Sequence, residues 1–314
     1  MHNPLLQDQI FRHLQPSDLK AVALVCRAWN SAVEQPRYWS WAHLRLQPGK
    51  LKEIFLKAER IRNLGSVRLE PGFTSREIRS VLRVMTESRW RSVMFWGTDL
   101  SSAPSPLLSQ ALTAASLRDL ELCANSLTGE QLEEILGRIT GEPRPPLRRL
   151  KISQTSLEFV SAGLLARALL RLEELEVDAR VKVKRQRNMG SYSVEYDGPI
   201  LDEEQVRTFF QEMERSQDVK LRRLVLTGVD LTPVAPAVLS RAVLGLREVR
   251  LERCEFSDEQ ADTLVRDIAY SKPQQIALKT LSIFKTRVLI SPPLLRKVQE
   301  RINFQIVTDV IEIE

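Results

Sequence analysis

The sequence has few of the side chains that carry out chemistry. Its three histidines all lie within the first 43 residues, so the remainder of the 314-residue chain has no imidazole for acid–base catalysis. The three cysteines, Cys26, Cys123 and Cys254, are far apart and fit no metal-binding or C-x-x-C spacing. P-loop, G-x-S-x-G and G-x-G-x-x-G elements are absent. We therefore expect no catalytic site, no metal and no cofactor.

Long apolar runs and a strong charge of one sign are also missing. No stretch approaches the ~20 apolar residues that span a bilayer, and the first residues lack the layout of a secretory signal. A sparse, odd set of cysteines is typical of a reducing compartment. Basic residues number 46 and acidic residues 40, a mild excess of +6. We expect a soluble protein of the cytoplasm or nucleus.

A repeated apolar pattern runs through most of the chain. It reads apolar-x-x-apolar-x-apolar-x-x-Asn/Cys/Thr-x-apolar, and Leu117, Leu120, Leu122, Asn125 and Leu127 satisfy it. The steps between copies are mostly near the ~20–29 residues of a leucine-rich repeat. The copies begin at Trp41, Leu64, Trp90, Leu117, Leu147, Leu172, Leu221, Leu246 and Leu278.

Each copy predicts one strand followed by one helix. The apolar-x-apolar pair forms the inward face of a short strand, and the ninth residue turns the chain. Capping boxes then predict helix starts at Thr74/Glu77, Thr128/Gln131, Asp202/Gln205 and Ser257/Gln260. Because one unit cannot bury its apolar side alone, neighbours must stack. We predict an α/β fold: a horseshoe-shaped leucine-rich-repeat solenoid of about nine repeats over residues 41–314, with a parallel sheet on the concave side and helices outside.

The step from Leu172 to Leu221 is about twice the usual length, which indicates an insertion. Residues 180–200 contain alternating Val and Lys, a glycine-bearing turn and alternating Tyr and Val, a pattern typical of a β-hairpin. Three interpretations remain open for it: a solvated decoration, a substrate contact or a nuclear-import signal.

Residues 1–40 do not fit the repeat and predict a small all-α module. Apolar residues recur at helical spacing from Leu5 to Leu14, and Ser17-Asp18 marks the start of a second helix. Forty residues are too few for an independent core. Their apolar side chains must therefore be buried against a partner or against the first repeat as a cap.

The segments Ile10–Leu14, Ser17–Leu19 and Leu24–Trp29, followed by Tyr38-Trp39, resemble an F-box. The resemblance implies that the helices of residues 1–40 dock a Skp adaptor, which links the chain to a cullin scaffold. The matching adaptor-facing residues would be Pro4, Leu5, Ile10, Phe11, Leu14, Leu19, Val25, Cys26 and Trp29.

The strand positions beside the inward leucines project from the concave face and predict a site for a protein substrate. An exposed Trp or Phe beside Arg is a usual anchor of protein interfaces, although terminal segments could instead cover Trp96 and Phe284. The residue just before each predicted strand is often Arg. These arginines form a basic column, which could equally be a solvated rim. The predicted substrate-binding residues are Arg68, Met94, Trp96, Glu121, Lys151, Arg250, Glu252, Arg253 and Phe284.

These features together predict a non-catalytic substrate-recognition subunit of a Skp–cullin–F-box ubiquitin ligase, monomeric outside the complex. One alternative is a non-degradative repeat scaffold or inhibitor whose N-terminal helices only cap the solenoid. A nucleic-acid-binding repeat protein is less favoured, because Glu121, Glu176 and Glu252 are interspersed with the basic positions of the concave face.

Overall fold

The computed structural model describes residues 43–49, 62–142, 145–178 except 156, 158 and 159, 201–216, 219–284 except 273 and 275, and 292–307, together with isolated residues between 9 and 29. The chain divides into two compact units. The first comprises Met1–Leu127 and Pro145–Leu147, and the second comprises Thr128–Arg144 and Arg148–Glu314.

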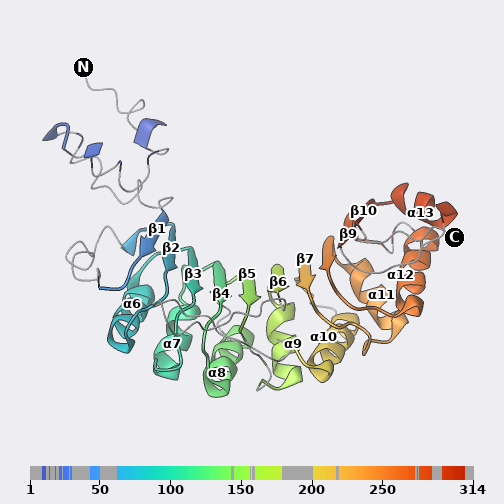
Figure 1. Ribbon diagram of the computed structural model, residues 1–314, viewed down its shortest axis with the longest axis horizontal. Helices are drawn as coiled ribbons and strands as arrows, with labels where there is room; N and C mark the ends of the chain where they lie inside the picture. The colour runs from blue at the N-terminus through green and yellow to red at the C-terminus, as the bar shows by residue number, and fades with distance from the viewer. Residues whose placement is uncertain are drawn as a thin grey trace, which may run out of the picture. The chain divides into compact units, whose positions relative to one another are not determined.

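The described residues of the first unit form four parallel strands with helices on one face of the sheet (Figure 1). Its strands pair in sequence order, so each repeat lies beside the next. The elements are β1 (His43–Leu46), β2 (Ser66–Leu69), α6 (Ser75–Glu87), β3 (Ser92–Trp96), α7 (Ser105–Leu112) and β4 (Asp119–Cys123).

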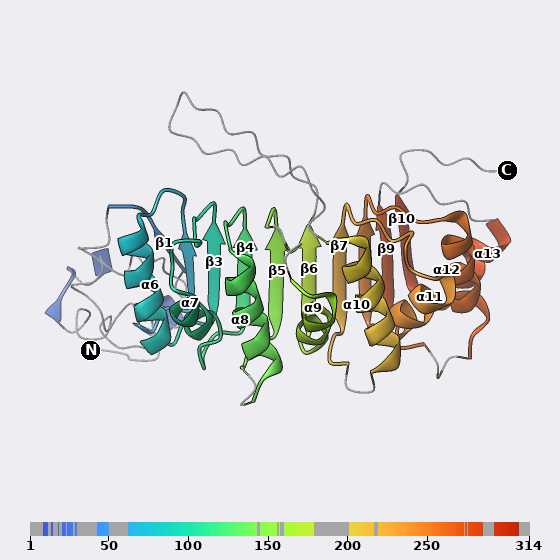
Figure 2. The ribbon, with the colours of Figure 1, turned by 90° about the horizontal axis from the view of Figure 1, so that it is seen from below.

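The second unit continues the same alternation with six parallel strands, again paired in sequence order. Figure 2 shows its strands running in one direction with helices packed on one face. The elements are α8 (Gly129–Thr140), β5 (Arg149–Ser153), α9 (Ala162–Leu170), β6 (Glu174–Asp178), α10 (Glu203–Arg215), β7 (Arg223–Thr227), α11 (Pro236–Gly245), β8 (Glu248–Glu252), α12 (Asp258–Tyr270), β9 (Thr280–Phe284), α13 (Pro292–Gln299) and β10 (Asn303–Val307).

The repeat pattern fixes the strands. Each strand from β1 to β9 begins two residues after a start position of the pattern, as β3 does at Ser92 after Trp90. This confirms the predicted leucine-rich-repeat fold. A further strand, β10, pairs in parallel with β9 beyond the last copy of the pattern. The hairpin predicted for residues 180–200 lies outside the described residues.

Burial alternates along the strands as a one-sided sheet requires. In β3, Val93 and Phe95 are fully buried, whereas Met94 is half-buried and Trp96 is exposed. The buried series packs under the helices, whose inward residues include Ile78, Val81 and Leu82 of α6. The opposite side, which we call the open face, carries the side chains available to a partner.

The turn after a strand has a constant backbone geometry. The eighth residue of several repeats has a positive φ, at Gly97, Ala124, Gln154, Gly228 and Arg253. The ninth residue then bonds to backbone nearby: the Asn125 amide donates to the Phe95 carbonyl at 3.1 Å. The Cys254 thiol donates to the Leu226 carbonyl at 3.4 Å in the same way. The polar ninth position therefore ties one strand end to the preceding one.

All four predicted capping boxes are present, at the starts of α6, α8, α10 and α12. In α10 and α12 the third helical residue is a buried Gln, and its side-chain amide also donates hydrogen bonds to the preceding repeat. Gln260 Nε2 donates to the carbonyls of Leu231 and Val234 at 2.7 and 2.5 Å. Gln205 makes the same pair of bonds to Leu157 and Val160, both at 2.8 Å. Each Gln thus caps its own helix and fastens it to the preceding repeat.

Among the helices that the structure describes, none has the length and apolar character needed to cross a bilayer.

Candidate functional site

The described residues of the N-terminal segment combine a small apolar contact with exposed apolar side chains. Phe11 is fully buried and meets Trp29 edge-on, with ring centroids 5.5 Å apart. Ile10 remains 42% exposed and Val25 63% exposed. Phe11 and Trp29 therefore hold the segment together, while Ile10 and Val25 are available to a partner.

The other predicted adaptor-facing residues divide in the same way. Leu14 is half-buried and Cys26 is exposed. Pro4, Leu5 and Leu19 lie outside the described residues. Leu24, which the residue-level prediction omitted, is 87% exposed beside Val25. The sequence signal for Leu24 was its place in the segment that resembles an F-box. Helical spacing alone does not tell whether an apolar residue faces the interior or the solvent.

On the open face of the first unit, Trp96 and Arg68 form one contact. The Arg68 guanidinium lies 4.9 Å from the centroid of the Trp96 ring, and Trp96 is 39% exposed. Arg68 Nε also lies 2.9 Å from a Glu70 carboxylate oxygen, as an ion pair rather than an aligned hydrogen bond. Strand register places Arg68, Met94 and Glu121 side by side on β2, β3 and β4. The four predicted residues of this unit therefore share one surface.

The open face of the second unit carries a related pair. The Arg250 guanidinium lies 4.8 Å from the centroid of the Phe284 ring and 3.1 Å from a Glu252 carboxylate oxygen. Lys151 pairs with Glu176 at 2.9 Å. Arg253 is exposed but lies in the turn after β8 with a φ of 54°, so it leaves the strand face. Arg250 is therefore already engaged by an acid and an aromatic ring.

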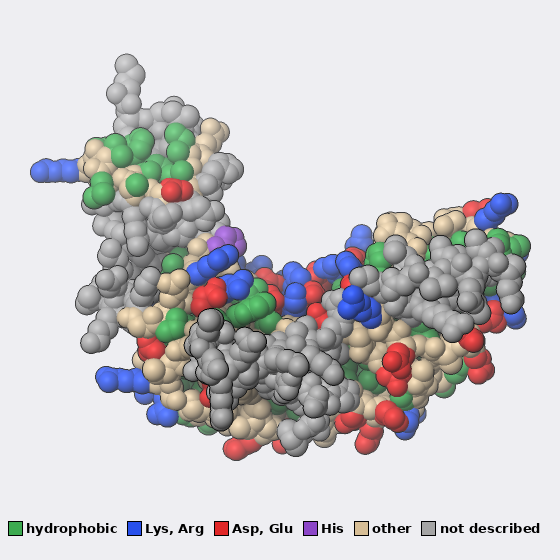
Figure 3. All heavy atoms as spheres, viewed as in Figure 1, with side chains coloured by type: hydrophobic (Ala, Val, Ile, Leu, Met, Phe, Trp, Pro, Cys, Tyr) green, Lys and Arg blue, Asp and Glu red, His purple; other side chains and the backbone are tan. Residues whose placement is uncertain are grey.

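A ladder of alternating charge crosses the first residues of four strands in the second unit. Arg149 lies 3.7 Å from Glu174, and Arg223 lies 3.4 Å from Glu174 and 3.0 Å from Glu248. Figure 3 shows basic and acidic side chains next to one another in the region where Figure 1 has β5, β6 and β7. The sequence signal for this ladder was the alternation of sign at the third repeat position, which the prediction did not use.

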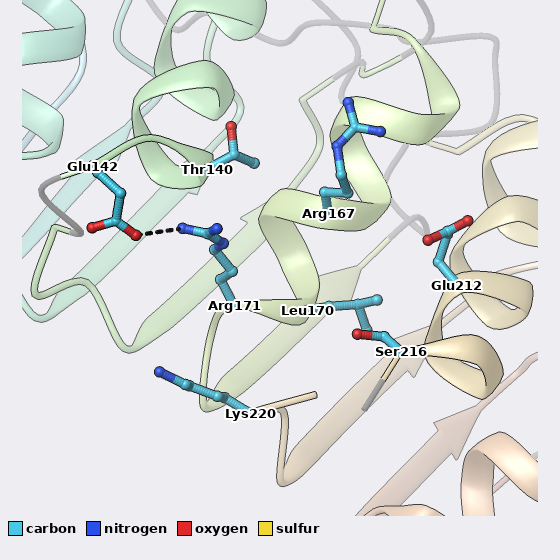
Figure 4. Close-up of a pocket in the computed structure, with 8 residues that line it drawn as sticks. All are labelled: Thr140, Glu142, Arg167, Leu170, Arg171, Glu212, Ser216 and Lys220. Atoms are coloured by element: carbon cyan, nitrogen blue, oxygen red, sulfur yellow. Dashed lines mark ion pairs between the residues drawn. The ribbon is translucent and has the colours of Figure 1, made fainter. Parts of the chain in front are cut away.

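A hollow of about 640 Å³ in the second unit lies where α8, α9 and α10 end (Figure 4). Arg171 pairs with Glu142 at 3.6 Å across it. Arg167 and Glu212 lie on opposite sides, from α9 and α10, and Lys220 precedes β7. Charged side chains and hydroxyl groups line the hollow. Among these lining residues no nucleophile is held next to a base.

The described residues hold no cluster of three or more potential metal ligands. Burial raises the pKa of the Cys254 thiol to about 11, against weaker opposing effects of nearby backbone N–H groups. A thiol in that condition is protonated at neutral pH and is a poor nucleophile. Cys254 is therefore a structural residue of its turn. Cys123, the last residue of β4, is also buried.

Comparison with known proteins identifies the N-terminal part. Residues 6–45 match the model of the F-box-like family. None of the curated proteins compared matches the chain. Among solved structures, a leucine-rich-repeat protein of Leptospira interrogans aligns at 13% identity with a TM-score of 0.41, over 84% of this chain and 54% of the bacterial protein. The chain thus spans about half the length of that protein, and the repeat assignment stands on the strands and turns described above.

Proposed function

We propose that this F-box and leucine-rich-repeat protein is the substrate-recognition subunit of a Skp–cullin–F-box ubiquitin ligase. The carrying observation is the family match at residues 6–45 together with the exposed apolar group of Ile10, Leu24 and Val25. Large apolar side chains that are exposed commonly mark a protein interface. In this proposal they dock the Skp adaptor, and through it the cullin, and the chain acts where ubiquitin is transferred, in the cytoplasm or nucleus.

The open face holds the substrate in this proposal. Trp96 with Arg68, and Phe284 with Arg250, are aromatic–guanidinium pairs on exposed strand surface. Trp and Arg are enriched among the residues that dominate binding energy in protein interfaces. The chain contributes no catalytic group. Its part is to hold a protein target beside the ubiquitin donor, which raises the effective concentration of the reacting groups.

The test is ubiquitin transfer in the reconstituted complex of this chain with a Skp adaptor and a cullin, with cell extract as the source of targets. The variant Arg68→Ala/Trp96→Ala removes the anchor pair of the first unit and is expected to lower modification of the captured targets severalfold. The control Asp262→Ala/Arg266→Ala removes an exposed ion pair on α12. Equal modification by both variants would place the substrate elsewhere. A chain that forms no complex would indicate the scaffold alternative.

A further inference from the structure

The basic residues of the second unit differ in whether an acidic side chain lies close enough to neutralise their charge. On the strands themselves, Arg149, Lys151, Arg223 and Arg250 each have an acidic partner within 4 Å. The residues that immediately precede the strands form a separate row, which we call the N-terminal edge. Because parallel strands begin at the same side of a sheet, these residues lie next to one another (Figure 2).

Backbone bonds establish the order along the N-terminal edge. The Arg222 amide donates to the Glu173 carbonyl, the Arg247 amide to the Arg222 carbonyl, and the Lys279 amide to the Arg247 carbonyl. Arg148 comes before Glu173 and pairs with it at 3.6 Å. The next three positions, Arg222, Arg247 and Lys279, are all basic.

These three side chains are exposed, and within the described part of the chain none has an acidic partner within 4 Å. Neighbouring strands are about 4.8 Å apart, so three positive charges lie along roughly 10 Å of edge. The adjacent acid Glu248 is held by Arg223. A helix C-terminus, such as that of α11 nearby, offsets only about half a unit of charge. The edge therefore keeps a local positive excess.

The three cations also surround a hollow. It has a volume of about 290 Å³ and is lined by Leu221, Arg222, Gly245, Arg247, Ala277 and Lys279. Gly245 leaves its space open, since a Cβ added there would meet no atom within 4 Å. The backbone of another chain can approach closely at Gly245 and Ala277, while the three cations reach its side chains.

From this charge and shape, we propose that Arg222, Arg247 and Lys279 form a docking site for an acidic segment of a partner protein. Three or four residues of extended chain, at about 3.3 Å each, span the same ~10 Å. Guanidinium groups bind carboxylates through two parallel hydrogen bonds, which favours a run of Asp or Glu side chains. The site is distinct from the open face and does not depend on the ligase role.

Two other anions fit less well. Single-stranded nucleic acid is held by aromatic side chains that stack on its bases, and the hollow is lined by none. A single phosphate group is too small to meet three charges spread over ~10 Å. The acidic segment is the ligand that engages all three positions.

The test measures the anisotropy of a fluorescein-labelled peptide containing six successive glutamates, titrated with the full chain. We expect binding at low ionic strength that weakens as salt is added. The variant Arg222→Glu/Arg247→Glu/Lys279→Glu should bind roughly ten-fold more weakly, because three exposed ion pairs are replaced by repulsion. The neutral variant Arg222→Gln/Arg247→Gln/Lys279→Gln should fall between the two.

The matched control is Arg76→Glu/Arg83→Glu/Arg118→Glu. It changes the net charge by the same amount at exposed positions of the first unit. Full binding by the control and weak binding by the edge variant support the proposal. Equal losses in both would overturn it, because binding would then follow net charge alone. Tighter binding of a single-stranded oligonucleotide of equal charge, lost in the edge variant, would also overturn it in favour of nucleic acid.

Discussion

At the scale of single residues, each aromatic anchor of the open face shares its arginine with an acid. Arg68 contacts Trp96 and Glu70, and Arg250 contacts Phe284 and Glu252. Such an arginine is held in place over the ring, which reduces the side-chain entropy that binding would otherwise remove. In the proposed function, a substrate residue that contacts Trp96 would therefore meet a side-chain arrangement that is already ordered.

The three cysteines should differ in reactivity. Cys123 and Cys254 are buried and Cys26 is exposed. At pH 8 the Cys254 thiol stays protonated because its pKa is raised to about 11, and the thiolate is the reactive form. Titration of the native chain with a coloured disulfide reagent should show one fast thiol, with the other two reacting only in denaturant. In Cys26→Ser protein no fast thiol should remain, and fast reaction of Cys123 or Cys254 would contradict their burial.

At the scale of elements, a buried Gln links consecutive repeats. Gln260→Ala removes the bond from the Ser257 amide to the Gln260 side chain and leaves the carbonyls of Leu231 and Val234 without their donor, while the Ser257 cap on the backbone N–H of residue 260 remains. We expect a loss of about 2–3 kcal/mol in the free energy of unfolding, measured with urea. Ser257→Ala removes only the cap and should lose about 1 kcal/mol. If the two variants lost the same amount, the bonds between repeats would contribute nothing.

The capping box of α6 uses Glu77 where the others use Gln, and this makes it sensitive to pH. Hydrogen bonds from the Thr74 amide, and also from the Gly49 amide and Thr74 hydroxyl, hold the Glu77 pKa below its usual 4.5, although burial opposes them. Since the folded pKa is lowered, the stabilisation is complete above the unfolded pKa and is lost as pH falls through the folded one. Glu77→Gln should therefore be less stable at pH 7, by about 0.5–1 kcal/mol.

The measurement for Glu77 is the urea midpoint of both proteins between neutral pH and pH 3. The difference between them should shrink as pH drops below 4.5. Arg79→Gln serves as a charge control on the same helix. A difference that stays constant with pH would show that the Glu77 charge has no part in the cap.

At the scale of the whole molecule, the sequence predicts those structural features that residues close together in the chain determine. A strand of four or five residues is set by its own apolar alternation, so β1 to β9 could be located from the repeat pattern. Helices α9 and α11 lack a side-chain cap hydrogen bond at Ser161 and Ala235, so no capping box marks where they begin. The pair Arg68–Trp96 depends on the register of two strands, which a single repeat does not encode.

In the N-terminal segment, too, the sequence predicts helices but not which side chains are buried. The spacing of its apolar residues predicted helices, but Phe11 became interior and Leu24 exposed through their tertiary surroundings. Apolar residues on two sides of a short helix look alike in sequence. The exposed members are the ones on which the adaptor proposal now depends.

The central claim is that this segment docks a Skp adaptor, and the most direct test is calorimetric measurement of the dissociation constant between the adaptor and the full chain. The variant Leu24→Asp/Val25→Asp changes two exposed side chains, so the fold should persist. The account predicts tight binding by the wild type and roughly 100-fold weaker binding by the variant, because buried apolar anchors dominate interface energy. A wild-type chain that is folded but does not bind the adaptor, or a variant that binds it equally well, would contradict the account.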